Sequence, residues 1–436
     1  MDTFLCVLLK FGGYPMKKYN LFDAVQKIKN IVESKEFLCV ARKTSKAFTR
    51  LRKMSFCDII YFIIGAKRRC VQHELDKFFE QKGCESMSRQ AFAQAREKIK
   101  PEAIRSINDG LLVDFEKYDP HIQTMHNHRV FAVDGSLIDL PENAVLRETF
   151  GYTTGSNNSS HCKARAMIGF DVLNQICAYG ELINLSTSET TKMHDISDYF
   201  AEIEPYKNCI FVLDRAYPSL NLFKKMEQNH QFYLMRAAMS FYKEIVNAPK
   251  SDQIVTITRK GKKCDVRVLK FTLSSGITEI LVTNLPQNFT YEELVSLYAK
   301  RWGIETNYHY LKNVELLECF TGESVTAILQ DFYAGILMLN IAAIAHREQS
   351  SILVDEGLIH PKKYIYKPNN KQLICDIKTD FVKMLSAKSK FSKVFKQLFL
   401  LIKIKRFSYA IVPDRHKPRK DPKRHSTLKS HPKMPL

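Results

Sequence analysis

Short apolar runs alternate with helix-like stretches through the middle of the chain. Two of these runs, residues 130–133 and 210–213, are each followed by an aspartate, Asp134 and Asp214. Continuously apolar runs that end in a turn residue are typical of buried parallel strands. Because open α/β sheets bind ligands at the carboxyl ends of such strands, both aspartates are predicted at a functional edge. Taken alone, each aspartate is more often a turn or cap residue.

The same patterning predicts the other elements of an α/β fold. Strands are predicted at residues 164–171, 176–185 and 232–236, and helices at 193–204 and 219–229. Alternating β-branched and polar residues predict three more strands at 254–258, 265–270 and 280–283, separated by turns near Gly261 and Gly276. Residues 238–286 are therefore predicted to form a β-rich insertion. The alternative is that these strands extend one larger sheet.

The segment 290–312 has the length of a helix and begins with a capping box at Thr290. Four polar residues recur along it at spacings of three, four and seven: Tyr298, Arg301, Glu305 and Lys312. At about 100° per residue, these side chains fall within roughly 60° of one another on one helix face. The alternative is a surface helix without a functional site, in which an arginine and a glutamate simply pair at i, i+4.

Asp134, Asp214 and Glu305 together form a candidate carboxylate triad. Hard divalent cations take oxygen ligands, and two such ions about 4 Å apart can clamp the attacking and leaving oxygens of a phosphodiester. The triad therefore suits metal-dependent phosphodiester chemistry.

The spacing of the four polar residues, continued by residues 316–322, resembles the YREK signature of DDE transposases of the insertion-sequence-four family. Residues 134–136 resemble the first aspartate block of that family, 214–217 the second, and 283–286 the approach to the third. The resemblance spans about residues 88–349. The chain departs from the pattern at Ala216, where the family commonly has glycine. Its only tryptophan, Trp302, lies in the signature segment rather than in the insertion.

The resemblance implies an RNase H-like catalytic core at 126–237 and 287–349, interrupted by the insertion at 238–286. It implies an N-terminal helical DNA-binding region at 1–125. Residues 350–414 are predicted to be a helical C-terminal region, and the basic residues 415–436 a disordered tail. In that tail, eight lysines and arginines stand against one aspartate.

The same resemblance implies a transposase that cleaves double-stranded DNA at the ends of an insertion element and joins them to target DNA. Asp134, Asp214 and Glu305 would be catalytic and hold two Mg²⁺ ions, for which Mn²⁺ may substitute. Tyr298, Arg301 and Lys312 are expected to bind DNA phosphates, and the family acts as a homodimer in its synaptic complex. Two alternatives stay open: a noncatalytic DNA-binding protein derived from a transposase, or another RNase H-like nuclease.

Composition agrees with a DNA-binding protein of several domains. The chain has 436 residues and a net charge of +20, which favours an anionic partner, although charge alone does not distinguish nucleic acid from an anionic membrane. No membrane span and no signal peptide are predicted. Eleven cysteines without any C-x-x-C spacing argue against a zinc module and a disulfide scaffold, so a cytoplasmic protein with reduced thiols is expected.

Basic residues cluster in the N-terminal region at 42–53 and 67–69. Ser88 is predicted to cap a helix that presents Arg89 and Arg96 on one side. We expect this region to contact the terminal DNA of the element. The alternative is a solvated basic helix face.

Overall fold

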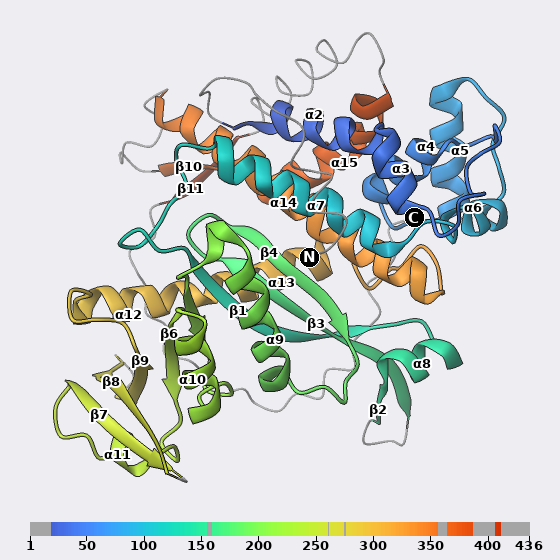
Figure 1. Ribbon diagram of the computed structural model, residues 1–436. Coiled ribbons are helices and arrows are strands. Elements are labelled where there is room, and N and C mark those ends of the chain that lie inside the picture. Colours follow the sequence, from blue (N-terminus) through green and yellow to red (C-terminus); the bar gives the residue numbers. More distant parts are fainter. Residues whose placement is uncertain are drawn as a thin grey trace.

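The computed structural model describes residues 19–154, 159–259, 261–273, 276–355, 364–386 and 406–410. A central sheet lies between two groups of helices, and a larger helical layer made of N-terminal and C-terminal elements covers one side of it (Figure 1). The predicted tail at 415–436 lies outside the described residues.

Nine strands make up the central sheet. They are β1 (Val130–Asp139), β2 (Tyr152–Thr154), β3 (Ser160–Asp171), β4 (Ile176–Ile183), β5 (Ile210–Leu213), β6 (Phe232–Ala237), β7 (Asp252–Arg259), β8 (Lys262–Thr272) and β9 (Thr278–Thr283). The path β4-β3-β1-β5-β6 contains antiparallel pairs as far as β1, followed by parallel pairs from β1 to β6. The predicted parallel arrangement of the two aspartate-bearing strands is therefore confirmed.

The strands predicted for the insertion continue this same sheet. β9 pairs with β6 in antiparallel fashion, and β8 and β7 follow outward from β9. In Figure 1 they form the lower end of the molecule together with the short helix α11 (Lys243–Val246). Residues 252–283 thus have the arrangement of the larger-sheet alternative.

Alternating side chains of β1 explain why the sheet is covered on both faces. Phe131 and Val133 pack into a core with helices α9 (Glu189–Glu202) and α10 (Leu220–Gln228). Ala132 packs into the opposite core, which contains most of the remaining helices. Successive residues of a strand point to opposite faces, so a run that is apolar at every position needs cover on both sides.

The N-terminal helices share that second core with the helices that follow the signature segment. The N-terminal ones are α2 (Leu21–Val32), α3 (Lys35–Ala41), α4 (Phe56–Gly65), α5 (Val71–Lys82), α6 (Arg89–Arg96) and α7 (Pro101–Tyr118). The later ones are α13 (Gly303–Asn313), α14 (Val325–Asp355) and α15 (Asn370–Ser386). A short helix, α8 (Ala144–Phe150), lies beside β2 and β3. The predicted N-terminal region is therefore packed onto the rest of the protein rather than forming a body of its own.

The C-terminal region differs from the all-helical prediction for residues 350–414. Besides α15, its described part contains the antiparallel pair β10 (Tyr364–Pro368) and β11 (Arg406–Ala410). Tyr364, Ile365 and Tyr366 give β10 a strand-favouring sequence, and pairing with the distant β11 satisfies its backbone, which a local helix pattern does not reveal.

α14 is long and apolar enough to cross a membrane by length and composition, contrary to the expectation that no stretch approaches a span. Of its most apolar window, 89% is buried inside the protein. The helix contacts α7, α4, α2 and β4. A helix that is hydrophobic all round belongs in a core or in a membrane, and here it is the central helix of the core.

The signature segment is not one continuous helix, so that prediction was wrong. Its capping box is confirmed, because Thr290 and Glu293 exchange both hydrogen bonds at the start of α12 (Tyr291–Ala299). A 3₁₀ turn at Lys300–Trp302 then separates α12 from α13. Because a 3₁₀ turn has fewer residues per turn than an α-helix, the 100° projection across it does not hold.

Candidate active site

The candidate site begins where β5 ends beside β1, which continues past Asp134 as far as Asp139. Ala132 of β1 is in register with Val212 of β5, and each is followed two residues later by an aspartate. Asp134 and Asp214 are therefore brought to the same edge of the sheet, as predicted. The Asp134 carboxylate accepts a hydrogen bond from its neighbour's N–H at 2.9 Å, and the Asp214 carboxylate accepts one from the N–H two residues on at 2.8 Å.

The pKa of Asp134 shows that carboxylates gather here. This pKa is raised to about 6, mainly by burial and in smaller part by the negative charges of Asp214 and Glu189. The Gly135 N–H and the guanidinium of Arg301 act in the opposite direction. A carboxylate held among other carboxylates favours its protonated form unless a cation compensates the charge. A cation bound at this edge of the sheet would therefore be electrostatically favourable.

Glu189 is a third carboxylate at this edge. It is the first residue of α9, behind the Ser188 cap. Its carboxylate lies 3.3 Å from Nε of Arg165 and 3.4 Å from the hydroxyl of Tyr217, which donates to it. A Cβ on Gly135 would lie 2.6 Å from the Glu189 side chain, so only glycine permits this approach.

Helix α13 supplies Glu305, which does not join the two aspartates directly. Its carboxylate, 43% exposed, accepts a hydrogen bond from Arg301 at 3.2 Å. The same arginine interacts electrostatically with Asp134 and Asp214. Arg301 therefore stands between the predicted third carboxylate and the first two.

Two further side chains attach α13 to β1. The Tyr308 hydroxyl lies 2.8 Å from the carbonyl oxygens of both Asp134 and Ala166. The Lys312 ammonium donates to the carbonyl of Leu137 and lies 3.7 Å from the carboxylate of Glu318. Lys312 thus points toward the strand that carries Asp134, but its ammonium is engaged by protein groups. Tyr308 was missed by sequence reasoning, because its hydroxyl bonds to backbone atoms that are distant in sequence.

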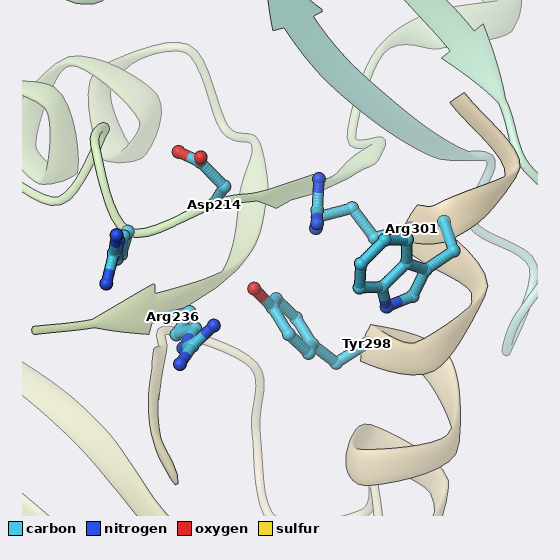
Figure 2. A pocket seen from close by; sticks show the side chains of 6 residues that line it. Asp214, Arg236, Tyr298 and Arg301 are labelled. Atoms are coloured by element: carbon cyan, nitrogen blue, oxygen red, sulfur yellow. The ribbon is translucent and has the colours of Figure 1, made fainter. Parts of the chain in front are cut away.

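A pocket of about 260 Å³ opens beside Asp214 (Figure 2). Its lining residues are Asp214, Arg215, Arg236, Tyr298, Arg301 and Trp302. Figure 2 shows Tyr298 and Arg301 reaching into it from the signature segment, opposite Asp214 and Arg236. Three guanidiniums around one cavity make it a site for an anion, since arginine binds phosphate through a planar fork of donors.

The aromatic members of the pocket differ in exposure. Tyr298 is buried, and burial raises the pKa of its phenol to about 12, although Arg301 and Arg236 oppose the shift. Its hydroxyl therefore remains a neutral donor at ordinary pH. Trp302 is 46% exposed, and the Arg301 guanidinium lies over its ring, 5.4 Å from the ring centre. Arg236 pairs with Glu279 at 2.9 Å.

The residues present fit divalent metal ions only in part. Asp134 and Asp214 supply the oxygen ligands that Mg²⁺ prefers, at a place where several negative charges lie close together. Among the described residues, no group of three His, Cys, Asp or Glu side chains is close enough together to hold a metal ion. With Glu305 held by Arg301, the predicted triad is not assembled as a ligand set.

Ala216 does not disturb the turn after Asp214. It is absent from the described residues with positive φ, so this turn does not require the glycine that the family commonly has there. All ten described cysteines are free, which agrees with the expectation of reduced thiols.

Comparison with known proteins finds a family match in the part of the chain that contains the candidate site. Residues 125–341 match the family model described as "Transposase DDE domain". No curated protein matches the sequence. A solved structure described as "Cryo-EM structure of piggyBac transposase synaptic complex with hairpin DNA" aligns with a TM-score of 0.46 and 14% identity, over 89% of this chain and 86% of that chain. The segment that contains Asp134, Asp214 and Glu305 is therefore the part of the chain that is similar to a transposase DDE domain.

Proposed function

We propose that this protein is a transposase of the insertion-sequence-four type, which cuts DNA at the ends of its element and joins them to target DNA. The observation that carries the proposal is that Asp134, within β1, and Asp214, directly after β5, lie at equivalent positions of two adjacent parallel strands, in the segment that matches a transposase DDE domain. The sheet order β4-β3-β1-β5-β6, antiparallel and then parallel, supports an RNase H-like core.

Asp134, Asp214 and Glu305 would hold two Mg²⁺ ions, or Mn²⁺ in their place. Bound there, the metal ions would stabilise charge on the attacking and leaving oxygens of the phosphodiester. For Glu305 to join the aspartates, its hydrogen bond to Arg301 has to open. DNA supplies a reason for that change, because a phosphate in the pocket competes with Glu305 for the guanidinium.

The other residues of the site bind and orient DNA in this proposal. Arg301, Arg236 and Arg215 surround the pocket beside Asp214 and are suited to a backbone phosphate. The neutral phenol of Tyr298 can donate a hydrogen bond to the same phosphate. Lys312 would exchange the carbonyl of Leu137 for a phosphate oxygen, and Tyr308 would keep α13 seated on β1.

Glu189 has a supporting role in the same proposal. Its carboxylate touches the Gly135 backbone and holds Arg165 and Tyr217 around the first aspartate. It would keep the segment of β1 around Asp134 in place and add negative charge to the edge where the metal ions bind. A homodimeric synaptic complex and a cytoplasmic location belong to the proposal as expectations from the family resemblance.

The test is cleavage of labelled duplexes that carry the DNA flanking the coding region. Wild-type protein with Mg²⁺ should nick them at the element boundary, and Glu305→Gln should abolish nicking, because it removes the charge and keeps the shape. Glu292→Gln, a neutralisation at an exposed position of α12, is the matched control and should cleave like wild type.

Each other outcome selects a different function. Binding without cleavage by the wild type would favour the noncatalytic DNA-binding protein. Metal-dependent cleavage at many positions, with no joining to target DNA, would favour another RNase H-like nuclease. Cleavage that survives Glu305→Gln would remove Glu305 from the catalytic set.

A further inference from the structure

A short basic loop projects from the N-terminal helical region between α3 and α4. We call residues 49–53, with the sequence Thr-Arg-Leu-Arg-Lys, the arginine loop. All five residues are exposed. The loop lies outside the candidate active site, and none of its residues is used in the chemistry proposed above.

Both ends of the arginine loop are fixed in the core. Phe48 precedes it with a φ of 61°, and its ring packs against Phe56 at 5.4 Å between centroids. Met54 follows it and is 2% exposed. The last loop residue, Lys53, is held by Glu85 at 2.7 Å and by the carbonyl of Ser86 at 3.1 Å. The two ends of the arginine loop are therefore anchored to the protein, and its central residues project from these anchors.

The tip consists of a leucine between two arginines. Leu51 has a relative exposure of 104%, the highest of the exposed large hydrophobic residues in the described chain. A single exposed leucine is ordinary on a protein surface. What distinguishes this one is that its two sequence neighbours, Arg50 and Arg52, are also exposed, so that one apolar residue is flanked by two basic ones.

The surroundings of the tip are strongly positive. Between residues 37 and 57 the sequence contains no aspartate or glutamate but six basic residues: Arg42, Lys43, Lys46, Arg50, Arg52 and Lys53. Lys43 and Lys53 have carboxylate partners from elsewhere in the chain. No described ion pair involves Arg50 or Arg52. Their charge is available to an external anion.

We propose that the arginine loop enters the minor groove of DNA, with Arg50 and Arg52 along its floor and Leu51 wedged at a base step. A narrow A·T-rich minor groove has an enhanced negative potential that attracts arginine. Proteins that bend DNA frequently insert an apolar side chain between bases of that groove. The identification of the partner as DNA rests on the proposed function, whereas the groove and the roles of the three side chains come from the loop itself.

Binding measurements on the full-length protein test the groove. The probes are duplexes from the DNA flanking the coding region, first footprinted and then remade with G·C or inosine·C pairs in place of A·T pairs in the footprint. Inosine·C lacks the guanine amino group in the minor groove but resembles G·C in the major groove. Wild type should bind A·T and inosine·C duplexes alike, and G·C duplexes about tenfold more weakly.

The preference should disappear in the double variant Arg50→Ala/Arg52→Ala. Lys46→Ala, which removes an exposed charge from the same segment, should weaken binding to all three duplexes equally and keep the preference. The wedge is tested separately with 2-aminopurine at successive steps of the footprint. Its fluorescence should rise on binding of the wild type and not of Leu51→Ala.

The inference is overturned if the wild type treats inosine·C like G·C, or if the double variant keeps the wild-type preference. It is also overturned as a wedge if Leu51→Ala gives the same fluorescence rise as wild type. DNA cleavage and its dependence on Glu305 are measured in a separate assay. If that cleavage is intact and metal-dependent but the groove test fails, only this inference is refuted. All four substitutions are at exposed positions, and unchanged circular dichroism and melting verify that the variants fold.

Discussion

A buried cluster of charges joins the N-terminal helices to α14, and Asp331→Asn is the perturbation that tests it. Asp331 of α14 is 1% exposed and accepts a hydrogen bond from Arg96 of α6 at 2.8 Å. Arg68 lies 3.8 Å away and also donates to the Asp331 carbonyl. The backbone N–H of Thr321, in the loop after the signature helix, donates to the same carboxylate at 2.6 Å.

The expected loss of stability in Asp331→Asn follows from the groups that remain in the cluster after the substitution. The side-chain amide can still accept hydrogen bonds, but two guanidiniums that are 1% and 3% exposed lose the carboxylate that pairs with both of them. Breaking a buried ion pair by removing one partner typically costs about 3–5 kcal/mol. Because a domain has only about 5–15 kcal/mol of net stability, we expect a large fall in the urea midpoint.

The assay is urea unfolding of both proteins, followed in parallel by far-ultraviolet circular dichroism and by limited proteolysis at the N-terminal helices. Glu80→Gln is the matched control, since the Lys77–Glu80 pair is exposed to solvent and is expected to contribute little to stability. If Asp331→Asn unfolds within the range of that control, the cluster does not hold the N-terminal helices in place and the reasoning is refuted.

The same carboxylate makes a prediction about pH. Burial by itself would raise the pKa of Asp331, but Arg96 and Arg68 outweigh it and hold this pKa below its usual 3.8. A depressed pKa stabilises the folded state above the unfolded value, and the benefit is lost as pH falls through the folded pKa. The stability difference between wild type and Asp331→Asn should therefore be full at neutral pH and shrink below about pH 4. A difference that grows on acidification would contradict this sign.

Three further substitutions probe how the site is held. Tyr308→Phe removes the hydroxyl between α13 and β1, so DNA cleavage should slow at least severalfold while DNA binding, measured by fluorescence anisotropy, stays within about twofold. Gly135→Ala forces Glu189 aside, because the new Cβ would lie 2.6 Å from its side chain; cleavage should fall while the melting temperature changes little. Gly180→Ala introduces a Cβ 2.1 Å from a side chain of α14 and should lower the free energy of unfolding by about 1–3 kcal/mol, seen as a lower melting temperature. Wild-type cleavage by either of the first two variants, or wild-type melting by the third, would contradict these contacts.

Local patterns in the sequence determined the elements that carry the aspartates. The apolar run 210–213 became β5 with the predicted bounds, and the run at 130–133 began β1, because burial on both faces demands an apolar residue at every position. The parallel edge followed from the same signal, and with it the meeting of Asp134 and Asp214. The capping box at Thr290 was equally local, since it depends on residues only three apart.

Contacts between distant segments decided the rest. Arg96, predicted to face DNA, is instead 1% exposed, because α14 supplies Asp331 and Gln330 to receive its guanidinium. A surface arginine and a buried, paired one have the same local sequence pattern. Only tertiary packing distinguishes them.

The signature residues show the same division between sequence and structure. Their spacing in the sequence identified a transposase-like segment, but the 3₁₀ turn, the Arg301–Glu305 bond and the position of Lys312 arose from packing against β1 and β3. Helical spacing fixes which residues share a face only while the helix continues. Which groups those residues then meet is set by segments more than a hundred residues away in sequence, as the Tyr308 contacts to Asp134 and Ala166 illustrate.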